Sequence, residues 1–139
     1  MRILIGMAAV AALSGCMLNE MGGVSRQKVS GAVSKYDLVD MGAQQLSGEE
    51  ITVALSGKTF VEPNEGWIWE ISTDGKQQAR AKDGSWADDP DGTWEVSDGQ
   101  FCRKNADIKT RCSDVYRIGP YYRMTEADGS LAVWTITEG

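Results

Sequence analysis

The sequence predicts a mainly β domain (α+β overall) in which one short N-terminal helix precedes an antiparallel β-meander of about eight strands. Five Asp-Gly dipeptides, beginning at positions 74, 83, 91, 98 and 128, punctuate the second half of the chain. Asp-Gly suits tight turns because both residues tolerate a positive φ. Short runs rich in β-branched and aromatic residues lie around these dipeptides, and one segment carries helix signals. The predicted sheet either stays open or closes into a small barrel or cup.

Length and charge exclude several classes of protein. The chain has 139 residues, a formal net charge of −6 and no histidine. That length suits a single domain. Without histidine there is no imidazole to act as a general base, a triad member or a zinc ligand. The acidic balance argues against a nucleic-acid partner.

The first residues have the layout of a bacterial export signal. Arg2 supplies a positive charge and an uncharged apolar run follows it. The run from Ile3 to Leu18 covers 16 residues and is diluted by glycine, serine and cysteine. A bilayer-spanning helix needs about 20 apolar residues. Residues 1–15 are therefore predicted to be a signal peptide and not a membrane-spanning anchor.

The run Leu13-Ser14-Gly15-Cys16 resembles the lipobox of bacterial lipoproteins. That resemblance implies cleavage before Cys16 and acylation of its thiol and its freed amine. Two or more acyl chains hold a protein stably on a membrane. Positions 17 and 18 carry no acidic residue, which by analogy with lipoprotein sorting places the protein at the outer membrane, facing the periplasm. The alternative is an ordinary export signal with a chance cysteine.

Residues 16–45 are predicted to be the lipidated cysteine and a flexible tether, because they hold few large apolar side chains. Residues 46–139 are predicted to be the folded, β-rich domain. Its helix is expected from about Gly48 to Ser56, with Ser47 as N-cap and Glu50 completing a capping box. Gly57 ends that helix.

Strand-like segments follow Gly57, and Trp67 to Ile71 is the strongest of them. A further short strand is expected around Trp86. The other expected strands are residues 58–61, 76–82, 93–96, 100–103, 114–118, 121–125 and 131–137.

Cys102 and Cys112 remain once Cys16 carries lipid. An oxidising compartment outside the cytoplasm would pair them in a disulfide. The alternative, two thiolate metal ligands, lacks the histidine or further cysteines of a zinc site.

Five aromatic side chains form a candidate ligand or partner surface: Trp67, Trp69, Tyr121, Tyr122 and Trp134. Tyrosine and tryptophan combine a large apolar area with a polar tip, which suits interfaces. Tryptophan is also typical of a protein core, and the core interpretation is the favoured one for these tryptophans.

Two charged segments of the chain each allow two interpretations. Asp89, Asp91 and Asp98 partly fit a calcium-binding loop, although the position of the first ligand is Ala87. A solvated acidic loop is favoured, and no metal or cofactor is expected. Six basic residues between 103 and 123 either pair with this acidic segment across strands or meet an anionic partner. They are Arg103, Lys104, Lys109, Arg111, Arg117 and Arg123.

The segment Gly92 to Cys102, with Cys112 and the run Ser56-Gly57-Lys58-Thr59, resembles a family of small secreted bacterial domains of unknown function. The resemblance implies a helix-plus-sheet envelope domain with a cysteine pair, and it carries over no catalytic residue.

These observations predict an envelope-anchored lipoprotein with a non-catalytic binding domain. The expected partners are the membrane through the lipid, and an envelope protein, a cell-wall component or a small hydrophobic ligand. The alternative is an inhibitor of a cell-wall hydrolase such as lysozyme. A hydrolase is a third hypothesis, and no specific pair of carboxylates supports it.

Overall fold

The computed structural model describes residues 24–64, 66–84, 87–105 and 109–139, which form three helices and one antiparallel sheet of ten strands. The helices are α2 (Arg26–Ser30), α3 (Lys35–Asp40) and α4 (Gly48–Leu55). The strands are β1 (Gln44–Gln45), β2 (Lys58–Glu62), β3 (Trp67–Ile71), β4 (Lys76–Ala81), β5 (Ala87–Ser97), β6 (Gln100–Lys104), β7 (Arg111–Ser113), β8 (Val115–Ile118), β9 (Tyr121–Met124) and β10 (Ile136–Glu138). The prediction of a mainly β fold is confirmed.

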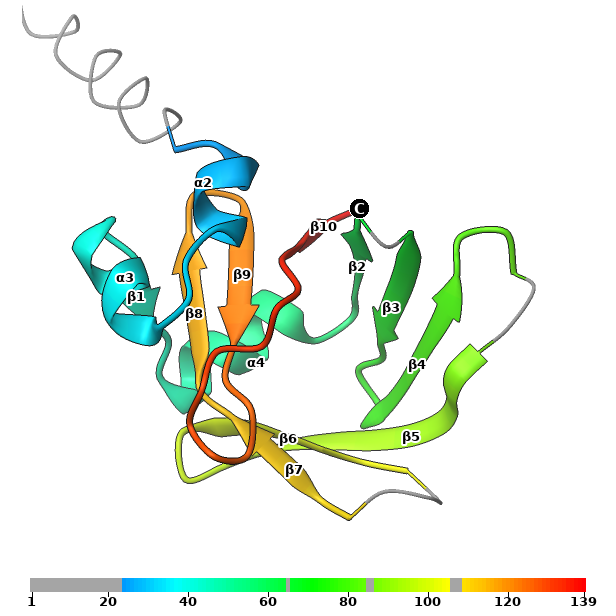
Figure 1. The fold of residues 1–139 in the computed structure, drawn as a ribbon. Helices are drawn as coiled ribbons and strands as arrows, with labels where there is room; N and C mark the ends of the chain where they lie inside the picture. Colours follow the sequence, from blue (N-terminus) through cyan, green and yellow to red (C-terminus); the bar gives the residue numbers. More distant parts are fainter. Residues whose placement is uncertain (1–23, 65, 85–86, 106–108) are drawn as a thin grey trace, which may run out of the picture.

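The sheet curls around its own core, so that it forms an open half-barrel (Figure 1). Its strand order is β1-β8-β9-β10-β2-β3-β4-β5-β6-β7. Strands β2 to β7 are neighbours in chain order, as a meander requires. The last three strands depart from that order, because β10 inserts between β9 and β2.

A single residue, Asp114, joins the edge strand β7 to β8 near the opposite edge of the sheet. The Asp114 amide donates to the Thr125 hydroxyl over 2.9 Å, and its carboxylate accepts from the Gln100 side chain over 3.0 Å. Asp114 therefore ties β6 to the segment that follows β9. These bonds bring the two ends of the curled sheet together.

Helix α4 begins as the sequence predicts. The Ser47 side chain accepts from the Glu50 amide, and the Glu50 carboxylate accepts from the Ser47 amide, which completes the capping box. The helix ends before Gly57, whose φ of 76° suits glycine. Ile51 and Leu55 are fully buried against the sheet. Helix α4 thus covers one end of the curled interior.

Four of the five Asp-Gly dipeptides have their glycine at positive φ in turns, but the prediction of a turn at Gly92 is wrong. Gly92 lies within the long strand β5. A Cβ added there would lie 3.1 Å from the carbonyl oxygen of Lys104 and would overlap the Gln77 side chain. Gly92 is needed for close packing between strands and not for a turn. Trp86 lies outside the described residues.

The prediction of a flexible tether is wrong for residues 24–45, which form α2, α3 and β1. Val29 and Leu38 are fully buried in a second apolar cluster with Tyr116 and Ile118 of β8. Each of these short helices thus packs on the outer face of the sheet through one buried apolar side chain. Residues 16–23 lie outside the described part of the chain, as does the predicted signal peptide.

The main core fills the concave side of the sheet. Phe60, Trp69 and Phe101 are its largest buried side chains, and α4 packs onto them. All three face the concave side, and so does every second residue along their strands. Within the described ranges, no helix has the length and apolar character needed to cross a membrane.

Candidate functional site

Three of the five aromatic residues singled out in the sequence come together. The ring centroids of Trp67 and Trp134 lie 5.8 Å apart, and those of Trp69 and Trp134 lie 6.1 Å apart. Trp69 is 2% exposed and donates its indole N–H to the Gln77 side chain. Trp67 and Trp134 are half-buried and pack against the core. This cluster is mainly part of the core, which agrees with the favoured interpretation of the tryptophans.

Tyr121 and Tyr122 separate because neighbouring residues of β9 point to opposite faces. Tyr121 packs against the cluster under α2 and α3. Tyr122 points inward, where its ring meets Phe60 at a centroid distance of 5.4 Å. The five aromatic residues therefore do not form one surface.

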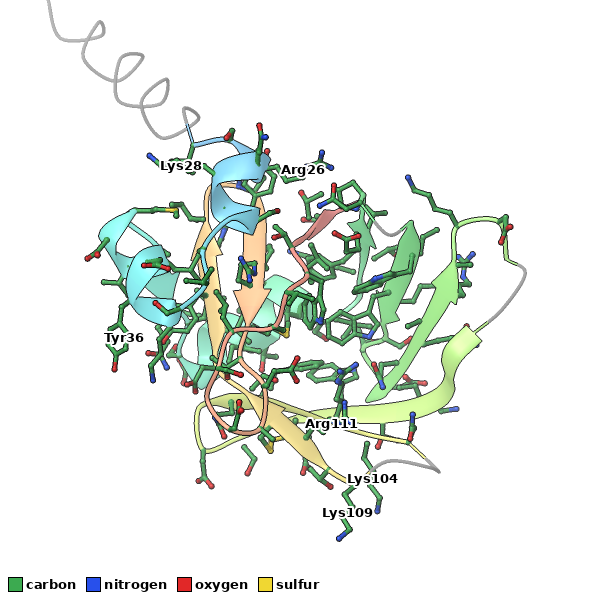
Figure 2. All side chains as sticks on the ribbon, viewed as in Figure 1. Arg26, Lys28, Tyr36, Lys104, Lys109 and Arg111 are labelled. Atoms are coloured by element: carbon green, nitrogen blue, oxygen red, sulfur yellow. A yellow bond between two sulfur atoms is a disulfide. The ribbon has the colours of Figure 1, made fainter. Side chains whose placement is uncertain are left out.

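The six basic residues between 103 and 123 also separate. Lys104, Lys109 and Arg111 lie at the free end of the β6–β7 hairpin (Figure 2). The strand register sets Lys104 opposite Thr93 and Arg103 opposite Trp94, and the Arg103 guanidinium carbon lies 5.7 Å from the Trp69 ring centroid. Arg123 is 2% exposed and donates to the backbone carbonyls of Val29, Ala32 and Ala132. Arg123 therefore cannot meet an anionic partner.

The calcium-loop residues are only partly described. Asp98 occupies the β5–β6 turn with a φ of 54°. The side chains of Asp89 and Asp91 lie outside the described part. Among the side chains that are described, no group of three or more cysteine, aspartate or glutamate residues is arranged to hold a metal ion.

The predicted disulfide is present: the sulfur atoms of Cys102 and Cys112 lie 2.09 Å apart. The two residues face each other across β6 and β7. The next pair in that register is Arg103 and Arg111. Like charges directly opposite each other destabilise a strand pair. The disulfide therefore holds the edge strand β7 against this repulsion.

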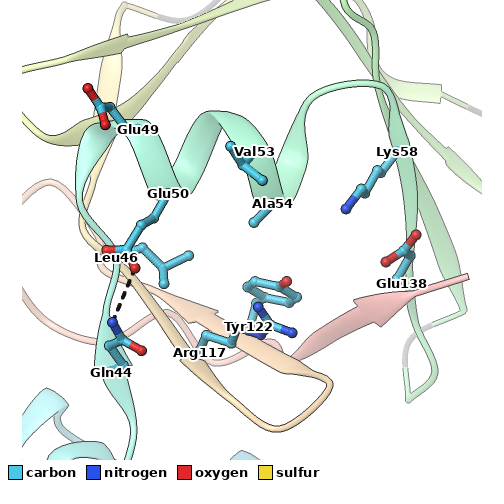
Figure 3. Close-up of a pocket in the computed structure, with 10 residues that line it drawn as sticks. All are labelled: Gln44, Leu46, Glu49, Glu50, Val53, Ala54, Lys58, Arg117, Tyr122 and Glu138. Atoms are coloured by element: carbon cyan, nitrogen blue, oxygen red, sulfur yellow. Dashed lines mark hydrogen bonds between the residues drawn. The ribbon is translucent and has the colours of Figure 1, made fainter.

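A pocket of about 440 Å³ lies between α4 and the concave face of the sheet (Figure 3). Figure 3 shows Lys58 and Glu138 on one side of it, Gln44 and Glu50 on the other, and Arg117 and Tyr122 between them. The remaining lining residues are Leu46, Glu49, Val53 and Ala54.

Strand register brings these residues together. Gln44 of β1 pairs with Arg117 of β8, and Arg117 pairs with Tyr122 of β9. Glu138 of β10 pairs with Phe60 of β2, and Lys58 lies two residues before Phe60 on the same face. Paired residues point to the same side of a sheet. Five strands thus direct polar side chains into the space under α4.

The central group of the pocket is the Tyr122 phenol. The residue is 5% exposed, and no hydrogen bond joins its hydroxyl to any residue within the described ranges. Burial raises the pKa of Tyr122, and the nearby Arg117 guanidinium opposes that shift. The phenol is therefore neutral at neutral pH and can donate a hydrogen bond. A buried hydroxyl without a partner is costly, so a ligand that accepts from it gains affinity.

Two cations, Arg117 and Lys58, line the same pocket. The Arg117 guanidinium carbon lies 5.6 Å from the Tyr122 ring centroid, and its Nε donates to the Gly119 carbonyl over 3.2 Å. Its two terminal nitrogens make no hydrogen bond to the described residues. Lys58 likewise forms no ion pair with them. The Lys58 ammonium, the terminal nitrogens of Arg117 and the Tyr122 hydroxyl therefore have no acceptor among the residues that the structure describes.

Acidic side chains complete the rim. The Glu50 side chain is fixed, because its carboxylate accepts from the backbone amide of Ser47 over 2.9 Å and from the side-chain amide of Gln44 over 3.2 Å. The hydrogen bonds from Ser47 lower the pKa of Glu50, so this carboxylate is ionised at neutral pH. Glu138 is exposed on the opposite side. The pocket thus combines converging donors with separate carboxylates.

Among the pocket residues, sequence reasoning singled out only Tyr122 and Arg117 as candidates for contact with a ligand or partner, and it did not connect them with each other. Lys58 and Glu138 lie 80 positions apart in the chain, and only the insertion of β10 beside β2 makes them neighbours. The period-two pattern of the strands does place Lys58 on the face of Phe60 and Tyr122 on the face of Met124.

Comparison of the chain with protein-family models, with curated proteins and with solved structures found no match. The resemblances to a lipobox and to a family of secreted domains therefore stay predictions.

Proposed function

We propose that the protein is a bacterial lipoprotein, held by Cys16 at the outer membrane and facing the periplasm, whose domain binds a small ligand without transforming it. The run Leu13-Ser14-Gly15-Cys16 supports the anchor. The Cys102–Cys112 pair at disulfide distance supports an oxidising compartment. The pocket under α4 supports ligand binding.

The observation that carries the binding proposal is the Tyr122 hydroxyl. It is buried, neutral and without a hydrogen-bond partner among the described residues, and Lys58 and Arg117 share its pocket. An incoming carboxylate satisfies all three donors at once. Charge-assisted hydrogen bonds of this kind are roughly twice as strong as neutral ones.

The acidic rim selects among carboxylate ligands. Glu50 and Glu138 repel a purely anionic ligand and attract one that also carries an ammonium group. The ligand class is therefore a small zwitterion, such as an amino acid or a short peptide. A glycosidase that works with two carboxyl groups needs one of them held protonated as the acid. The ionised Glu50 does not fit that role, which favours binding over hydrolysis.

The test is a titration of the mature chain with the dipeptide alanyl-alanine, followed by amide chemical shifts. Two matched probes remove one charge each: N-acetyl-alanyl-alanine lacks the ammonium group, and alanyl-alaninamide lacks the carboxylate. We expect saturable shifts around Lys58, Arg117 and Tyr122 for the dipeptide, and affinities about tenfold weaker for both matched probes.

Two variants locate the site. Arg117→Gln is expected to weaken dipeptide binding about tenfold, and Tyr122→Phe is expected to weaken it less while leaving the stability unchanged or raised. Lys104→Gln is the matched control, because Lys104 is an exposed cation of the β6–β7 hairpin and lines no part of this pocket. Absence of saturable shifts, or equal losses in Lys104→Gln and Arg117→Gln, would refute this binding site.

A further inference from the structure

The surface of α2 and α3 combines exposed apolar side chains with basic ones. Within the described residues, five large apolar side chains are markedly exposed: Val33, Tyr36, Val39, Val53 and Val133. Three of these fall within seven consecutive residues, 33–39. Tyr36 and Val39 are three apart on α3 and so share a face, and Val33 directly precedes the N-cap Ser34. We call Arg26, Lys28, Val33, Lys35, Tyr36 and Val39 the α2–α3 surface.

Basic residues accompany this apolar group. Lys28 is exposed, Arg26 and Lys35 are half-buried, and the Lys35 ammonium lies 5.7 Å from the Tyr36 ring centroid. Residues 24–41 hold three basic and two acidic side chains, whereas residues 42–139 hold ten basic and seventeen acidic. The α2–α3 segment is therefore net positive on an otherwise acidic chain.

The position of this surface in the chain indicates what it meets. Eight peptide units separate Cys16 from Val24, which gives a reach of at most about 29 Å. A lipid on Cys16 holds the N-terminal end of the described chain close to the headgroups. Figure 2 shows Arg26 and Lys28 at that end, and Lys104, Lys109 and Arg111 at the far end of the molecule.

We propose that the α2–α3 surface rests on the bilayer, with Arg26, Lys28 and Lys35 against anionic lipid headgroups and with Val33, Tyr36 and Val39 at the interface. Basic residues close to an anionic membrane are attracted to it within about one Debye length, roughly 8 Å at physiological salt. Tyrosine favours the membrane interface because its ring is amphipathic. This orientation rests on the proposed lipid anchor, and it leaves the β6–β7 hairpin pointing away from the membrane.

The test uses the full lipidated protein in vesicles of phosphatidylethanolamine and phosphatidylglycerol. With Cys16 acylated and Cys102 bonded to Cys112, the substitution Val33→Cys adds the single free thiol for a fluorescent label. Thr110→Cys is the matched control, because Thr110 is exposed and β-branched like Val33 and lies between Lys109 and Arg111 at the far end of the molecule (Figure 2). A lipid with a nitroxide headgroup then quenches the label according to its distance from the membrane.

We expect quenching about threefold stronger at position 33 than at position 110. The triple substitution of Arg26, Lys28 and Lys35 by glutamine is expected to reduce that ratio, as are vesicles of phosphatidylcholine alone. The same triple substitution of Lys104, Lys109 and Arg111 is expected to leave the ratio unchanged.

Equal quenching at positions 33 and 110 in vesicle-bound protein would overturn the proposed orientation. A strong ratio that survives the Arg26, Lys28 and Lys35 substitutions would overturn the role of these charges. Failure of the protein to sediment with vesicles at all would refute the lipid anchor, and the two failures are therefore distinguishable.

Discussion

Replacing Arg123 by methionine is expected to lower the free energy of unfolding by about 4 kcal/mol. The guanidinium donates over 2.7 Å to the carbonyl of Val29 and over 3.2 Å to those of Ala32 and Ala132. Methionine fills a similar volume but donates nothing, so the buried carbonyls of Ala32 and Ala132 lose their donor, and the Val29 carbonyl keeps the Ala32 amide at 3.3 Å. Burial lowers the pKa of Arg123, yet arginine stays charged at neutral pH. No described carboxylate forms an ion pair with it.

Urea unfolding of Arg123→Met and of Arg117→Met compares two arginines six positions apart on neighbouring strands. Arg117 is exposed, and its substitution is expected to change the free energy of unfolding by less than about 1 kcal/mol. In hydrogen-exchange measurements of Arg123→Met, the loss of amide protection is expected to be largest in α2, because Arg123 donates to the Val29 carbonyl of that helix. If Arg123→Met and Arg117→Met lose equal stability, the buried network does not fix α2 to the sheet.

Removing the disulfide has the second large expected effect. The double variant Cys102→Ala, Cys112→Ala is expected to lose about 3 kcal/mol, because the bond closes a short loop in the unfolded chain. The melting temperature should then fall by about 10–20 °C.

Circular dichroism melts of the oxidised protein, the reduced and alkylated protein, and the double-alanine variant measure this effect. Reduced and alkylated protein should resemble the variant. Because β7 is an edge strand that pairs through three residues, hydrogen exchange should show its amides as the first to lose protection. An unchanged melting temperature would contradict a stabilising bond.

Local signals made much of this fold predictable. The capping box of Ser47 and Glu50 can be recognised from four consecutive residues of the sequence, and α4 begins there. Most Asp-Gly dipeptides form turns for the same local reason. Gly92 differs because its neighbour Gln77 comes from another strand, and a dipeptide carries no information about that contact. The helices α2 and α3 escaped prediction because their burial rests on single side chains, Val29 and Leu38, in polar surroundings.

The candidate site was less predictable than the fold. Its residues come from five strands and α4, and the register that unites them depends on β10 entering beside β2. The sequence shows that Tyr121 and Tyr122 face opposite sides, but not which of them faces the core. Arg123 reads as a surface cation in the sequence, and only tertiary packing provides the carbonyls that make its burial tolerable.

The central claim is that Cys16 carries the lipid that places this binding domain at the envelope. The most direct measurement is mass spectrometry of the protein extracted from bacterial membranes, with its N-terminal peptide sequenced. The account predicts a chain that begins at Cys16, with a diacylglyceryl group on the thiol and an acyl chain on the amine, and with Cys102 and Cys112 oxidised. A soluble chain that begins at Met1 and carries three free thiols would contradict it.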